Sequence, residues 1–234
     1  MAAPRKRYLV VIPARGGSKR LPGKNLMKIG DDSLIGCAIL CAKNASIVGD
    51  ITVSTDDQSI ATEAMRYGPY VPFMRPKQLA TDEAKTIDVV DHAIQWFASR
   101  GNHYDALIVL QPTSPLRTAQ DLRQAVELFE EREADAVVSV CKLEHPLQWC
   151  AELGPNGSME KFGESDNSQM RSQELAHHYR LNGAIYIYDI KSLSTYGKFY
   201  FNNNTFAYEM DEVSSIDIDT HHDYLMAEYF YSIR

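Results

Sequence analysis

The sequence lacks the long apolar runs that membrane proteins carry. No stretch approaches the length of a membrane-spanning helix, and the N-terminal residues contain no apolar core of a signal peptide. The four cysteines, at positions 37, 41, 141 and 150, form no C-x-x-C pair and no zinc-like pairing with histidine. We therefore expect a cytoplasmic protein with reduced, mostly buried thiols and no membrane partner.

Positive charge is also scarce relative to negative charge. The 234 residues include 24 Lys and Arg against 31 Asp and Glu, and the formal net charge is -7. This balance disfavours a general affinity for nucleic acid, although a local basic cluster can still bind a small anion. Internal repeats and low-complexity tracts are absent too, so we expect a single domain over residues 1–234 with one main core.

Two well-known phosphate-binding loops are missing, yet a third kind of basic loop is present. Neither the P-loop pattern nor the dinucleotide pattern G-x-G-x-x-G occurs, because Lys24 is followed by Asn25 and position 18 is a serine. Instead, the apolar run 8–12 ends at Pro13, and residues 14–25 read ARGGSKRLPGKN. Three glycines let the backbone approach an anion, and four cations supply charge. This loop is typical of a polyphosphate clamp at the carboxyl end of a strand.

The rest of the chain alternates apolar runs with amphipathic segments, which predicts an α/β fold with a mainly parallel sheet between two helical layers. The expected strands are 8–12, 50–55, 106–110, 136–140 and 184–188, and the expected helices are 33–45, 58–67, 87–99, 119–131 and a last one after Thr220. Residues 142–180 are rich in Gly, Pro, Asn, Ser and charge. We interpret them as an excursion from the sheet with two short strands.

Polar side chains near the C-terminus and after the third strand are candidates for chemistry. In the segment SIDID, Asp217 and Asp219 point to the same side if the backbone is extended, and such a pair suits a hard divalent cation like Mg²⁺. Asp219 could instead cap the last helix. Gln111 follows a strand and could read a base or a sugar, or only brace its loop.

Five ordered segments together resemble the N-acylneuraminate cytidylyltransferases, also called CMP-sialic acid synthetases. These segments are 14–25, 75–82, 110–118, 182–186 and 215–220, and the resemblance spans nearly the whole chain. It implies a three-layer, Rossmann-like nucleotidyltransferase fold. It also implies a reaction in which the anomeric hydroxyl of a nonulosonic acid such as N-acetylneuraminate attacks the α-phosphate of CTP, so that CMP-sugar and pyrophosphate are released.

The same resemblance implies roles for particular residues. The nucleotide would be bound by Arg15, Ser18, Lys24, Asn25, Arg75 and Thr86; the sugar by Gln111, Arg171, Tyr186, Tyr200 and Phe201; and Mg²⁺ by Asp217 and Asp219. The catalytic residues would be Arg15, Lys24 and Asp217, with Asp217 also a candidate for helping to deprotonate the sugar hydroxyl. The excursion 142–180 would reach a second subunit of a homodimer and complete its sugar pocket.

The sequence departs from the family pattern on the sugar side, which keeps other functions open. Gln148 stands where sialate enzymes often have lysine, and residues 171–176 read RSQELA instead of the more usual RRQDLP. A CMP-legionaminic acid synthetase or a Kdo cytidylyltransferase is therefore an alternative enzyme. A noncatalytic nucleotide sensor on the same fold is the alternative from another class.

Overall fold

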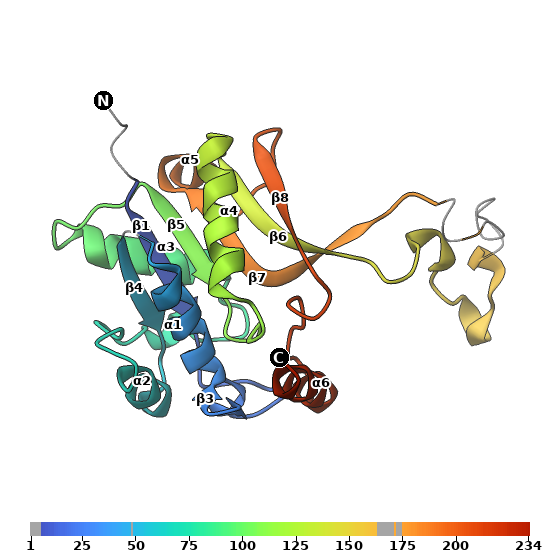
Figure 1. The fold of residues 1–234 in the computed structure, drawn as a ribbon, viewed down its shortest axis with the longest axis horizontal. Helices are drawn as coiled ribbons and strands as arrows, with labels where there is room; N and C mark the ends of the chain where they lie inside the picture. The colour runs from blue at the N-terminus through green and yellow to red at the C-terminus, as the bar shows by residue number, and fades with distance from the viewer. Residues whose placement is uncertain (1–5, 48, 163–170, 172–174) are drawn as a thin grey trace.

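A six-stranded mixed sheet forms the centre of the protein, and the computed structural model describes residues 6–47, 49–162, 171 and 175–234. The strand order is β4-β1-β5-β7-β6-β8 (Figure 1). The strands are β1 (Tyr8–Pro13), β4 (Gly49–Ser54), β5 (Ala106–Leu110), β6 (Ala136–Lys142), β7 (Tyr179–Asp189) and β8 (Thr205–Met210). Only β7 runs antiparallel to its neighbours within this sheet. The mainly parallel sheet is thus confirmed, with one reversed strand near its middle.

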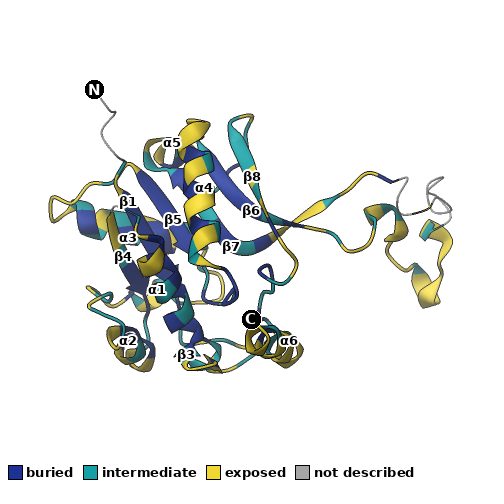
Figure 2. Cartoon of the chain, in the orientation of Figure 1, coloured by how far each residue is buried: buried dark blue, intermediate teal, exposed yellow. Residues whose placement is uncertain are grey.

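Helices cover both faces of the sheet, as the alternating pattern predicts. One face carries α1 (Leu34–Ala45), α2 (Gln58–Met65) and α4 (Ala119–Glu131), and the other carries α3 (Thr86–Ala98) and the unpredicted α5 (Ile190–Tyr196) (Figures 1 and 2). Along β1, Val10 and Ile12 pack under the first group, whereas Leu9 and Val11 pack under the second. In the described ranges no helix is both long and apolar enough to cross a membrane.

Side-chain caps fix where several helices begin. The Ser33 hydroxyl accepts a hydrogen bond from the Gly36 N–H at 3.2 Å and caps α1 as expected. The last helix, α6 (His221–Ser232), begins with a capping box between Thr220 and Asp223. The alternative that Asp219 caps this helix is therefore wrong.

The excursion leaves the sheet at the position predicted, but its local structure differs from the prediction. Strands β6 and β7 extend together to its base, where Lys142 pairs with Tyr179 (Figure 1). Its described residues then form 3-10 turns at Leu147–Trp149, Pro155–Gly157 and Glu160–Phe162. The two short strands expected beyond β6 and β7 do not occur in this part. Proline before the first turn, and proline and glycine within the second, favour turns over ladders.

The sequence did not predict the short strands β2 and β3 or the edge strand β8. Strands β2 (Lys28–Ile29) and β3 (Asp32–Ser33) form a small hairpin between the basic loop and α1. Strand β8 pairs in parallel with β6 and forms one edge of the main sheet.

The segment 215–219, expected to be extended, instead belongs to a turn and loop between β8 and α6.

Candidate active site

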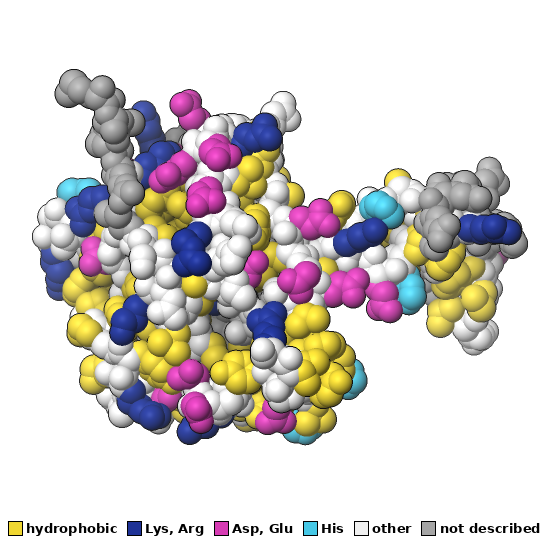
Figure 3. Space-filling model, viewed as in Figure 1, with side chains coloured by type: hydrophobic (Ala, Val, Ile, Leu, Met, Phe, Trp, Pro, Cys, Tyr) yellow, Lys and Arg dark blue, Asp and Glu magenta, His cyan; other side chains and the backbone are white. Residues whose placement is uncertain are grey.

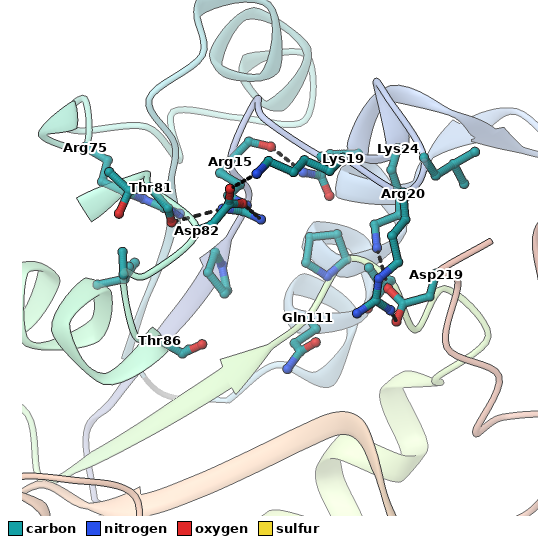
Figure 4. Close-up of a pocket in the computed structure, with 18 of the residues that line it drawn as sticks. Arg15, Lys19, Arg20, Lys24, Arg75, Thr81, Asp82, Thr86, Gln111 and Asp219 are labelled. Carbon is teal, nitrogen blue, oxygen red and sulfur yellow. Dashed lines mark hydrogen bonds and ion pairs between the residues drawn. The ribbon is translucent and has the colours of Figure 1, made fainter. Parts of the chain in front are cut away.

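A pocket of about 480 Å³ opens where β1 and β5 end. Its walls come from the basic loop after β1, the segment leading into α3, the loop after β5 and the turn before α6 (Figure 4). The lining includes every residue predicted to bind the nucleotide, namely Arg15, Ser18, Lys24, Asn25, Arg75 and Thr86, together with Gln111 and Asp219. Folding thus brings residues from distant parts of the chain to one cavity at the sheet's carboxyl edge, where open α/β sheets bind ligands.

The basic loop is shaped by a close backbone approach. A Cβ atom at Gly16 would lie 2.5 Å from Oδ2 of Asp57, so only glycine fits there without movement. Asp57 in turn caps α2 by accepting a hydrogen bond from the Ser59 N–H at 2.7 Å. The buried Asn25 amide donates to the carbonyl oxygen of Arg15 at 2.9 Å. Asn25 therefore braces the loop in addition to lining the pocket.

The four cations of the loop share two carboxylates. Arg15 lies 2.9 Å from Asp82, and Lys19 pairs with the same carboxylate. On the other side of the pocket, Arg20 and Lys24 lie 2.6 Å and 3.0 Å from Asp219 (Figure 4). Two positive charges in excess of these carboxylates therefore face the cavity, which suits a polyanion.

The burial of Lys24 and the site role of Asp82 are the two features of this loop that the sequence alone does not reveal. The Lys24 side chain is only 13% exposed, against 78% for Lys19, and its Nζ also donates to the Ile218 carbonyl at 2.8 Å. Asp82 was not predicted to be a site residue, although it closes one of the motifs that carry the resemblance. Its hydrogen bond from Lys19, with a further one from Arg15, lowers its pKa.

Arg75 is a buried cation that braces the wall of the pocket. Its Nε donates to the Ser54 hydroxyl at 3.1 Å, and its guanidinium also donates to the carbonyl oxygens of Ser54 and Leu79. Burial lowers the pKa of Arg75 to about 10, with the charge of Arg15 adding to this effect. Arg75 thereby fixes the segment that leads to Thr81 and Asp82. Its predicted contact with the nucleotide stays a prediction.

The two acids of the C-terminal segment lie on either side of Ile218, which is fully buried. Asp219 lines the pocket, whereas Asp217 lies deeper and its Oδ1 is buried without a hydrogen-bond partner. Burial raises the pKa of Asp217, and the charge of Asp219 adds to the rise. An unpartnered buried carboxylate oxygen beside a second carboxylate fits a divalent cation.

A cation at this position would need oxygen ligands from outside the protein. Among the residues that the structure describes, no group of three or more His, Cys, Asp and Glu side chains is arranged to hold a metal ion. Mg²⁺ commonly uses one or two carboxylates and completes its shell with water and substrate phosphates. The donor set here therefore fits Mg²⁺ bound together with a nucleotide.

Part of the predicted sugar side gathers around a bulge in β7. A Cβ atom at Gly183 would lie 3.6 Å from Oε1 of Gln111 and 3.7 Å from Oδ2 of Asp217. Tyr186, half-buried, stacks on Phe199 with 6.1 Å between ring centroids. Burial raises the pKa of Tyr186, and the charge of Asp217 raises it further. Gln111, Asp217 and Tyr186 therefore approach one another beside the pocket.

The other predicted sugar residues lie elsewhere in this chain. Tyr200 is 5% exposed, packs against Tyr188, and donates its hydroxyl to the Asp135 carbonyl at 3.2 Å, near the start of β6. Tyr200 therefore lies in the core of this chain and outside the pocket, and its contact with the sugar stays a prediction. Phe201 is exposed and does not line the pocket, and neither does Arg171, which lies on the excursion.

Comparisons with known proteins agree with this geometry. A family model described as Cytidylyltransferase matches residues 9–231. CMP-N,N'-diacetyllegionaminic acid synthase of Legionella pneumophila is 37% identical over 223 residues, which cover 95% of each chain. N-acylneuraminate cytidylyltransferase of Escherichia coli is 32% identical over 224 residues, which cover 95% of this chain and 52% of that protein.

A solved structure shows the same fold at lower sequence identity. CMP:2-keto-3-deoxy-manno-octonic acid synthetase complexed with CTP matches with a TM-score of 0.72 and 17% identity, covering 97% of this chain and 99% of that one. This likeness concerns the fold. The two sequence relatives support the resemblance that the motifs carry.

Proposed function

This chain belongs to the cytidylyltransferase family, and from that membership we infer that it transfers CMP from CTP to the anomeric hydroxyl of a nonulosonic acid and releases pyrophosphate. It is therefore a nucleotidyltransferase. The observation that carries this conclusion is the pocket itself, which gathers the predicted nucleotide-binding residues, four loop cations and two carboxylates at one edge of the sheet.

The chain's own residues can align and stabilise the transferring phosphate. Arg15 and Lys24 approach the cavity from opposite sides, and the triphosphate would replace Asp82 and Asp219 as their partners. Lys24 is the most buried of the four loop cations for which an ion pair is seen, so its charge is least screened by water. Phosphoryl transfer depends mainly on such positioning and charge, which explains why no nucleophilic triad is needed.

We propose that Asp217 and Asp219 hold Mg²⁺ when the nucleotide is bound. The ion would supply charge neutralisation for the phosphates of CTP. Asp217 also lies near Gln111 and Tyr186, the two predicted sugar residues that reach the site. From this place beside the predicted sugar residues, we propose that Asp217 receives the proton of the attacking hydroxyl, directly or through water.

The acceptor is a nonulosonic acid, and its exact identity is the finer proposal. The legionaminic acid relative is 37% identical and the neuraminate relative 32%, so N-acetylneuraminate and N,N'-diacetyllegionaminate are the two acids to compare first. We favour a legionaminic acid, because Gln148 and residues 171–176 depart from the sialate pattern. A Kdo enzyme is the third possibility.

We also propose a homodimer and a cytoplasmic location, both expected from the sequence. The dimer is supported by the excursion, which projects away from the sheet and exposes the apolar side chains of Leu147, Trp149, Leu153 and Met159 (Figure 3). Light scattering on the purified protein tests this proposal against the monomer mass of 26.4 kDa. A mass equal to the monomer across micromolar concentrations would refute it.

The decisive experiment for the function is a substrate panel. The purified protein is incubated with CTP, Mg²⁺ and each of three acids, namely N-acetylneuraminate, N,N'-diacetyllegionaminate and Kdo. We expect pyrophosphate release with one acid, formation of the matching CMP-sugar by mass spectrometry, and loss of both signals with EDTA. A protein that binds CTP but releases no pyrophosphate with any acid would be the noncatalytic sensor.

A further inference from the structure

The bulge in β7 carries a buried amide that no role has yet explained. Val138 of β6 pairs with Tyr186, whereas Val140 pairs with Leu181, so β7 holds extra residues between these two pairs. Gly183 lies in this bulge with a φ of 76°, a conformation that suits glycine. Beside it, Asn182 points inward and is only 1% exposed.

All four hydrogen-bonding positions of the Asn182 amide are used. Its Oδ1 accepts from the Ser139 hydroxyl at 2.6 Å and from the Ala184 N–H at 3.1 Å. Its Nδ2 donates to the Ser215 hydroxyl at 2.9 Å and to the sulfur of Met210 at 3.3 Å. A buried amide with every donor and acceptor satisfied has one favourable orientation and links the segments that it touches.

One of these links leads directly to the acidic segment. Ser215 is fully buried and stands two residues before Asp217. On the other side of Asp217, the Ile218 N–H donates to the Thr113 carbonyl at 2.8 Å. The segment that carries Asp217 is therefore held on both sides, by β7 at Ser215 and by the loop after β5 and Lys24 at Ile218.

The side chain of Asp217 does not alone account for its placement. Its Oδ1 is buried without a direct hydrogen-bond partner, and the Thr113 side chain is the polar neighbour that acts on the carboxylate. The backbone on which Asp217 stands therefore contributes to the position of the carboxylate. The contacts that hold this backbone include the bond from Asn182 to Ser215 and, at Ile218, the bonds to the Thr113 carbonyl and from Lys24.

We propose that Asn182 is a positioning residue for the transfer reaction, because its bond to Ser215 sets where the Asp217 carboxylate lies. Asn182 does not contact the substrates, since it is buried beneath the bulge. The inference rests on the proposed function, in which Asp217 serves the metal and the sugar hydroxyl. The bond from Asn182 to Ser215 explains how the Asp217 carboxylate is held although its Oδ1 lacks a direct hydrogen-bond partner.

A matched pair of serines can test this inference. Replacing Asn182 by alanine would remove a partner from each of Ser139, Ala184 and Ser215 at once and could prevent folding. Ser215→Ala removes only the acceptor of the critical bond. Ser214→Ala is the control, because Ser214 is also buried in the same turn, and its hydroxyl accepts from Arg234 at 2.9 Å instead.

We expect Ser215→Ala to lower kcat about tenfold, because small misplacements of reacting groups cost one to two orders of magnitude. The Mg²⁺ concentration for half-maximal activity should rise, while the affinity for metal-free CTP stays unchanged. Mn²⁺ binding in the presence of CTP, followed by electron paramagnetic resonance, should weaken as well. Ser214→Ala should leave all of these quantities at the wild-type values, and Ser215→Cys, which keeps a weak acceptor, should lie between.

Equal kcat and equal Mn²⁺ affinity for the Ser214 and Ser215 variants would overturn the positioning role. Failure of the proposed function is a separate outcome, in which the wild-type protein forms no CMP-sugar from any acid. The Mn²⁺ measurement still decides the question about Asn182 in that case, because it needs no turnover.

Discussion

Asp217 gives the sharpest prediction, because the same carboxylate should support catalysis and lower the free energy of unfolding. Its Oδ1 is buried and has no hydrogen-bond partner, and burial raises its pKa. A raised carboxyl pKa means that the folded protein disfavours the ionised form relative to the unfolded chain. We therefore expect Asp217→Asn, a substitution of equal size that removes the charge, to stabilise the ligand-free protein while it lowers activity.

The size of the stabilisation follows from the extra cost of leaving a charged group without partners, because asparagine keeps a polar atom at this place. An unsatisfied buried group costs about 1–3 kcal/mol and more when it is charged, and the substitution removes only the charge. Asp217 is not fully enclosed and Lys24 lies near enough to offset part of its charge, so the lower end, about 1 kcal/mol, is appropriate. For a chain of this length, that change raises Tm by about 2–4 °C. Turnover should fall at least tenfold in the same variant, because the metal and the sugar hydroxyl lose a ligand and a base.

The pH dependence provides an independent check on the cause. The charge of Asp217 opposes folding at every pH above its folded-state pKa, and this cost disappears as the pH falls toward the usual Asp value of about 3.9. The Tm difference between Asp217→Asn and wild type, measured by scanning calorimetry, should thus be largest at pH 7.5 and shrink on acidification. Asp219→Asn is the control, because it removes the partner of Lys24 and Arg20 and should bring no gain. A Tm at pH 7.5 no higher than that of wild type would refute the reasoning.

Three further predictions concern the basic loop. Lys24→Ala should lower turnover at least tenfold, and Lys19→Ala less, because the Lys24 ammonium is far better shielded from water; equal losses in pyrophosphate release would contradict this. Asp82→Asn should tighten CTP binding several-fold in calorimetry, since two cations lose an internal competitor, and weaker binding would show that Asp82 orients them instead. Gly16→Ala should lower Tm by several degrees through its clash with the helix-capping carboxylate, whereas Gly17→Ala, with open space around its Cβ, should leave Tm unchanged.

Elements with a strong local pattern were predictable from the sequence. Strand β5 and helix α4 have the expected bounds, since a continuous apolar run marks the first and an amphipathic period after the Thr118 cap marks the second. Strand β8 and helix α5 were missed, because one alternates along a half-exposed edge and the other has only seven residues. The reversed position of β7 between β5 and β6 depends on long-range pairing that no local window contains.

The residues of the candidate site were also only partly predictable from the sequence. Residues that directly follow strands, such as Arg15 and Gln111, reach the pocket because the topology brings the carboxyl ends of β1 and β5 together. Asp82 could not be identified as the partner of Arg15, since their ion pair joins two loops far apart in the sequence. The core position of Tyr200 could not be predicted from the sequence, because its aromatic ring fits a core as well as a binding surface.

Two buried polar side chains near the site have opposite consequences for the fold. The Asn182 amide has all its partners and ties three segments together, whereas the Asp217 carboxylate has a buried oxygen with none. The first arrangement stabilises the loop and the second destabilises it. The hydrogen bonds of Asn182 therefore offset the cost of holding the Asp217 carboxylate in an unfavourable environment. A cation bound between Asp217 and Asp219 would remove this cost, and the energy otherwise lost in the free protein would then favour binding.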